Sequence, residues 1–166
     1  MHQNQSLREV LLAEIATIAP ILTAQARESE KLGCLSDATW EHLRWNRLLG
    51  FLTPRELGGD EVYPLTQMEA IEALARIDAS VSWVVGNLAL GSAYGAAFLP
   101  ARSAQRIFAE RVPPMAATNA PKGQAEPVVG GYRVNGRWAF GSGIRHAEWV
   151  ISTTFSSGLE LKVPLS

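Results

Sequence analysis

The stretch of sequence that decides the fold is Gly131-Tyr132-Arg133-Val134-Asn135-Gly136-Arg137-Trp138-Ala139-Phe140-Gly141-Ser142-Gly143. At its centre, Asn135-Gly136 is a strong hairpin signal, because both residues tolerate the positive φ angles that a two-residue turn requires. The pattern predicts strands at 132–134 and 137–140, joined by this turn. Short apolar runs at 115–119 and 149–155 predict two more strands on either side of the hairpin.

The sequence before residue 112 is typical of helices. Ser6 and Glu9 form a capping box at the start of the first helix. Pro20 predicts a break, because proline in a helix interior lacks the backbone donor and clashes with the preceding turn. Apolar spacing, Gly and Pro punctuation then predict about six helices, over residues 7–19, 21–31, 37–49, 64–77, 79–99 and 100–111.

These elements predict an α+β protein with an all-helical domain at 1–112 and the opening strands of a β domain at 113–166. The β part has too few residues to cover both faces of a sheet. The tail after residue 156 contains no obvious closing element, so we expect this second domain to be incomplete.

An uncharged stretch at 79–101 is long enough to span a bilayer. Its small residues Gly91 and Gly95 suit a membrane dimer motif, and they equally suit close helix packing inside a soluble bundle. The stretch carries several polar side chains, and no basic cluster flanks it. We therefore expect a buried central helix and no membrane partner.

Composition narrows the possible functions. The 166 residues include 15 Lys+Arg and 16 Asp+Glu, a net charge of -1, which lacks the basic excess of nucleic-acid-binding proteins. The single cysteine, Cys34, and three scattered histidines predict no metal site and no internal disulfide. Cys34 is expected as a small apolar filler rather than a nucleophile. The N-terminus does not resemble a signal peptide, so a cytoplasmic location is expected.

The chemistry that spacing alone suggests is limited. Glycines on both sides of Ser142 let a backbone approach a flat ligand, to which the hydroxyl can donate. The same Gly-Ser-Gly sequence equally describes a plain exit from a strand. Glu69 and Glu72 are expected on a solvated helix face.

Several short motifs in order resemble the acyl-CoA dehydrogenase superfamily over residues 7–150. They are Pro54-x-x-x-Gly58-Gly59, the run 78–81 and the hairpin stretch 131–143. The hairpin stretch resembles most the flavin-dependent monooxygenase branch, the oxygenase components of two-component systems such as para-hydroxyphenylacetate hydroxylase and dibenzothiophene monooxygenase. In that branch the stretch reads Gly-Tyr-x-Val/Leu-x-Gly-x-Trp-x-Phe-x-Ser-Gly.

The resemblance implies an N-terminal helical domain, a middle β-barrel and a C-terminal four-helix bundle, of which the bundle is missing here. It implies FAD or FMN as cofactor, bound weakly by this chain. Phe140 would pack against the flavin ring, and Ser142, the expected catalytic residue, would bond flavin N5. The remaining implied site residues are Thr118, Asn119 and Gly143 for the cofactor and Trp83 for the substrate cavity.

Two departures from the family pattern bear on function. Gly91 stands where members of the branch often have a histidine. The absent bundle supplies the catalytic base, a Glu in the dehydrogenases and a His in the monooxygenases. The resemblance therefore implies a flavin-dependent oxidoreductase that is truncated and inactive alone.

The leading prediction is the oxygenase component of a monooxygenase. One alternative is an acyl-CoA dehydrogenase acting on a thioester, and another is a non-catalytic helical interaction module. The expected partners are a small aromatic or acyl-CoA substrate, a flavin reductase and further copies of the chain in a homo-oligomer.

Overall fold

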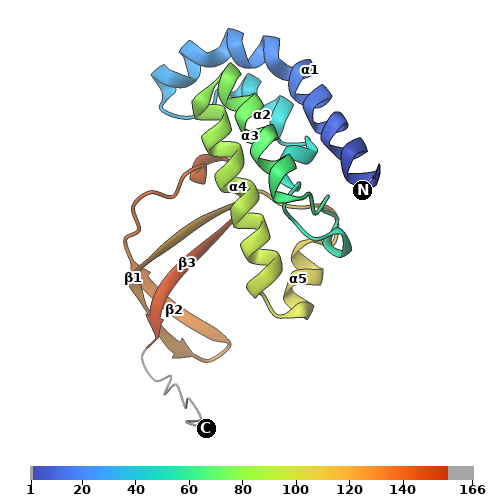
Figure 1. Ribbon diagram of the computed structural model, residues 1–166. Helices are drawn as coiled ribbons and strands as arrows, with labels where there is room; N and C mark the ends of the chain where they lie inside the picture. Colours follow the sequence, from blue (N-terminus) through green and yellow to red (C-terminus); the bar gives the residue numbers. More distant parts are fainter. Residues whose placement is uncertain (1, 157–166) are drawn as a thin grey trace.

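The computed structural model describes residues 2–156, with side chains from residue 6 onward (Figure 1). Five α-helices precede a three-stranded sheet, which confirms the predicted α+β order. The change from helix to strand falls between residues 107 and 115, while a division into domains at 112 stays a prediction. The expectation for the tail concerns residues beyond 156, outside the described part. The elements are α1 (His2–Leu32), α2 (Asp37–Leu43), α3 (Pro64–Ile77), α4 (Ala79–Phe98), α5 (Ala101–Ile107), β1 (Met115–Val128), β2 (Gly131–Gly136) and β3 (Trp149–Ser156).

Helix α1 runs through Pro20 without a break, so the prediction of two helices here is wrong. Pro20 lies on the exposed face of α1. The opposite face is anchored in the core, where burial of apolar side chains on both sides of the proline offsets the lost hydrogen bond. Those buried side chains are Leu11, Ile15, Ile18 and Leu22.

Two other helices are shorter than predicted. Helix α2 begins at the predicted cap, where the Ser36 hydroxyl accepts from the Thr39 N–H, but it ends at Leu43. A separate 3-10 turn at Arg47–Leu49 follows, because the Asn46 side chain accepts from Leu48 N–H and starts a new turn. Helix α5 ends at Ile107 instead of near residue 111.

Helix α4 is the central helix, with α3 and β1 packed against it (Figure 1). Asp78 caps its start, and the Asp78 carboxylate accepts from the N–H groups of Ser80 and Val81. Its length and composition alone would suit a membrane span. In the fold, the apolar composition serves the core, in which Val85 and Leu88 are fully buried.

The small residues of α4 pack against the sheet. A Cβ on Gly91 would overlap the Met115 carbonyl oxygen, and a Cβ on Gly95 would lie 2.6 Å from Met115 Sδ. In the described residues these two glycines therefore pack against Met115, the first residue of β1, whereas the sequence suggested packing against a helix. Close approach of a strand backbone requires glycine as strictly as close approach of a helix does.

The sheet has the order β2-β1-β3. Strands β1 and β2 are antiparallel from Gly123↔Gly136 to Val128↔Gly131, and β1 and β3 are parallel from Met115↔Trp149 onward. Strand 149–155 is thus confirmed, and the strand predicted at 115–119 continues to residue 128. Pro121 and Pro127 concealed this extension, because proline in a sequence argues against a strand interior.

The hairpin lies elsewhere than predicted. Asn135 and Gly136 belong to β2, and the turn between β1 and β2 falls at residues 129–130, where Gly130 has a φ of 85°. Residues 137–140 form no strand. The long strand β1 provides an earlier partner for β2, so the local turn signal at 135–136 is overridden by pairing at a distance.

Candidate functional site

The candidate site joins α4 to the connection between β2 and β3. The indole nitrogen of Trp83, on α4, lies 3.0 Å from Ser142 Oγ, in the connection, and donates a hydrogen bond to it. Trp83 is 65% exposed, so its ring remains available to a ligand. The fold thus brings together two predicted site residues that are 59 positions apart in the sequence.

The position of Ser142 follows from the path of the chain. Because β3 is parallel to β1, residues 137–148 must return from the end of β2 to the start of β1, and on the way they meet α4. Gly143 has a φ of 78°, and a Cβ there would lie 2.8 Å from Leu88 Cγ. The glycine beside Ser142 therefore allows the connection to sit directly on α4.

Phe140 stands at the same connection in a strained conformation. Its φ of 62° is in the left-handed region, which is costly for a non-glycine residue. Its side chain is 96% exposed, so burial does not compensate for this cost. Backbone strain of this kind clusters at functional sites, which makes Phe140 a candidate position.

Two further predicted residues lie on β1, near the register shift between Thr118 and Gly123. The Thr118 side chain is buried, and its hydroxyl lies 3.2 Å from Ser152 Oγ, to which it donates. This hydroxyl therefore links β1 to β3. Asn119 is exposed, at the point where the regular pairing with β3 is interrupted. Thr118 is close to the connection, since a Cβ on Gly141 would lie 3.7 Å from Thr118 Cγ2.

The residues present fit the ring system of a flavin. Trp83 and Phe140 offer exposed aromatic surfaces, and Ser142 offers a hydroxyl whose oxygen already has a donor, so its proton is available. Residues 2–156 hold no cluster of His, Cys, Asp or Glu that suits a metal ion.

Contacts behind the connection hold it against the helices. His146 stacks on Trp40 of α2, with ring centroids 4.7 Å apart, and burial lowers the pKa of His146 below its ordinary value. Arg145 Nη1 lies 3.4 Å from the Leu32 carbonyl oxygen at the end of α1. Sequence reasoning missed these contacts, for which no short-range signal exists.

A cavity of about 680 Å³ opens next to Trp83, between the end of α1 and the start of α4. Cys34, the expected apolar filler, is half-buried in its wall. Trp83 borders this cavity and also bonds Ser142, which is itself outside the lining. The lining includes Ser29, Gly33, Cys34, Leu35, Ser80 and Trp83.

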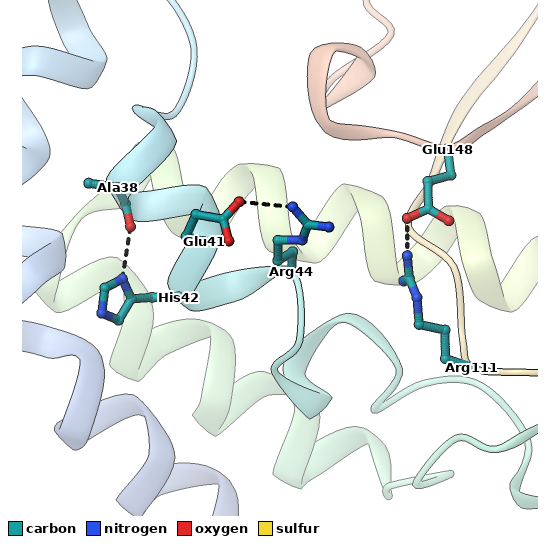
Figure 2. A network of polar contacts seen from close by, with 6 residues as sticks. All are labelled: Ala38, Glu41, His42, Arg44, Arg111 and Glu148. Carbon is teal, nitrogen blue, oxygen red and sulfur yellow. Dashed lines mark hydrogen bonds and ion pairs between the residues drawn. The ribbon is translucent and has the colours of Figure 1, made fainter.

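A second cavity, of about 570 Å³, adjoins Trp45 and is lined by both basic and acidic side chains. The guanidinium groups of Arg44 and Arg111 flank the Trp45 ring at 4.8 and 4.9 Å from its centroid. Figure 2 shows that Arg44 pairs with Glu41 and Arg111 with Glu148. The Arg44–Glu41 pair lies within the end of α2, and the Arg111–Glu148 pair joins the segments that lead into β1 and β3.

Comparison with known proteins supports the resemblance found in the sequence. No family model matches the chain. The oxygenase subunit HsaA of a flavin-dependent monooxygenase from Mycobacterium tuberculosis is 31% identical over 153 residues, which are 92% of this chain and 38% of the relative.

Two solved structures share the fold. XiaF from Streptomyces sp., in complex with FADH2 and glycerol, superimposes with a TM-score of 0.87 at 29% identity, over 93% of this chain and 39% of XiaF. The FMN-bound form of TdsC from Paenibacillus sp. A11-2 has a TM-score of 0.73 at 26% identity, over 89% of this chain and 40% of TdsC.

Helices followed by this mixed sheet define the N-terminal part of an acyl-CoA dehydrogenase-like flavoprotein. Within that superfamily, the chain is a counterpart of the N-terminal portion of the flavin-dependent two-component monooxygenase oxygenases. The chain spans about 38% of the length of these relatives.

Proposed function

We propose that this chain is the part of a flavin-dependent monooxygenase oxygenase component that holds one side of the flavin ring. The observation that carries the proposal is the Ser142 hydroxyl, bonded to Trp83 and two residues from the strained, exposed Phe140. The support from relatives is the presence of FADH2 in XiaF and FMN in TdsC.

In this proposal each residue has a defined task. Ser142 forms a hydrogen bond with flavin N5, in which its hydroxyl is the donor when the flavin is oxidised; Phe140 covers a face of the ring, and Trp83 bounds the substrate cavity. Asn119 contributes its side chain, and Thr118 and Gly143 contribute their backbone, at the edge of the ring. A bound reduced flavin supplies the reaction with oxygen, while these residues orient the ring and exclude water from it.

The substrate, partners and location also belong to the proposal. We expect a small aromatic substrate, since TdsC has been solved with indole, and a flavin reductase as partner, since HsaA is an oxygenase subunit. Self-association and a cytoplasmic location are further expectations. The names of the relatives favour an oxygenase over an acyl-CoA dehydrogenase or an interaction module.

The test is a titration of the 166-residue chain with FMN and FAD, followed by flavin fluorescence. Because the chain offers one wall of a site, we expect a Kd above about 100 µM, which corresponds to less than about 5.5 kcal/mol. Phe140→Ala and Ser142→Ala should each weaken binding. A chain that shows no saturable flavin binding would contradict the proposal and favour the interaction module.

A further inference from the structure

The hydrogen bond between Trp83 and Ser142 has only one possible direction. An indole N–H is a donor and has no acceptor lone pair, whereas a serine hydroxyl can donate and accept. With 3.0 Å between Trp83 Nε1 and Ser142 Oγ, the serine oxygen is the acceptor. The serine proton takes no part in this bond and is left for an acceptor elsewhere.

The backbones at both ends of the bond are held in place. On α4, Ser82 is buried and its hydroxyl donates to the Ile71 carbonyl at 2.8 Å, which fixes the helix beside Trp83. In the connection, the Ser142 N–H donates to the Phe140 carbonyl at 3.0 Å. With both backbones held, the remaining freedom lies in the rotations of the Trp83 and Ser142 side chains and of the serine hydroxyl.

We propose that Trp83 is a positioning residue for Ser142: its indole N–H occupies one lone pair of the serine oxygen and so directs the hydroxyl proton toward N5 of oxidised FMN. Accepting one hydrogen bond also polarises the hydroxyl and strengthens the bond that it donates. This inference rests on the proposed function and adds to it, because the family resemblance placed Trp83 only in the wall of the substrate cavity.

The first measurement needs no flavin. In ¹H–¹⁵N spectra of the 166-residue chain, the Trp83 indole proton should be shifted downfield and protected from exchange. Ser142→Ala should move it upfield and speed its exchange. The indole of Trp45 provides the control, since Trp45 is 66% exposed against 65% for Trp83 and should not respond. A Trp83 indole proton whose chemical shift and exchange rate are unchanged by Ser142→Ala would overturn the proposal.

The second measurement is a double-mutant cycle with FMN as the probe. Trp83→Phe keeps an aromatic ring and removes the N–H, so it and Ser142→Ala should each raise the Kd by up to about tenfold. If Trp83 acts through the serine, the double variant should bind no more weakly than Ser142→Ala alone. Trp45→Phe should leave the Kd unchanged.

The outcomes separate the two proposals. Multiplicative losses in the double variant, or a Trp83→Phe variant with wild-type affinity, would overturn the positioning role while leaving the flavin site intact. Absence of saturable FMN binding by the wild-type chain would reject the proposed function, and the indole resonance alone would then decide on the bond to Ser142.

Discussion

Gly91 lies against the backbone carbonyl of Met115 so closely that a Cβ atom at position 91 would overlap the carbonyl oxygen. This contact joins the middle of α4 to the first residue of β1. The resemblance to the monooxygenase branch implied a histidine at this position, and the observed backbone has no room for any side chain there. Gly91 is therefore a packing residue in this chain.

The first prediction follows from that contact. Gly91→Ala should lower the free energy of unfolding by about 1–3 kcal/mol, because the strand must shift to admit a methyl group. Gly86→Ala, in the same helix, is the matched control. Its Cβ would meet only the end of the Ile71 side chain at 3.3 Å, and the gain in helix propensity, about 0.8–1.0 kcal/mol, offsets that crowding. Urea denaturation that gives both variants equal stability would contradict the close approach.

The second prediction concerns Pro20 in α1. Proline inside a helix costs about 3 kcal/mol relative to alanine, and part of this is offset by the smaller entropy of its unfolded chain. Since Pro20 is exposed and α1 is continuous, Pro20→Ala should raise the free energy of unfolding by about 2 kcal/mol. Pro64, in the first turn of α3, needs no backbone donor, so Pro64→Ala should bring no gain. Thermal unfolding followed by circular dichroism compares the two.

The third prediction separates stability from ligand binding at Phe140. Phe140→Gly relieves a left-handed conformation, which costs about 1–2 kcal/mol in other residues, against a glycine entropy cost of about 0.5–1 kcal/mol. We expect unchanged or slightly higher stability together with weaker FMN binding. Phe140→Ala keeps the positive φ and should lose affinity without gaining stability. A large loss of stability in Phe140→Gly would show that the phenyl ring serves the fold.

The fourth prediction is a pH dependence caused by His146. Burial lowers its pKa in the folded chain below the ordinary value of 6.5. At a pH between the lowered pKa of the folded chain and the ordinary pKa of the unfolded chain, His146 binds a proton only in the unfolded chain. The free energy of unfolding therefore rises with pH in this range and levels off above about 6.5. His146→Phe keeps a ring against Trp40 and removes the titration. The variant should therefore lose less stability than the wild type between pH 7 and pH 5 in parallel urea denaturations.

The sequence by itself determined the features that depend on neighbours along the chain. Helix α3 follows from apolar spacing and from Pro64 at its start, and α4 follows from the uncharged stretch at 79–101. The order of helices before strands, and the superfamily, also follow from short motifs. Local capping and periodicity act within a turn or two, so these signals survive in the fold wherever packing agrees with them.

Only the tertiary structure decided the features that depend on distant contacts. Burial on both sides of Pro20 keeps α1 continuous, and the length of β1 moves the hairpin turn away from Asn135. The bond between Trp83 and Ser142 forms because the connection from β2 to β3 packs against α4. The energies of such contacts exceed local turn and helix preferences. The spacing of residues in the sequence does not predict which distant residues will be in contact.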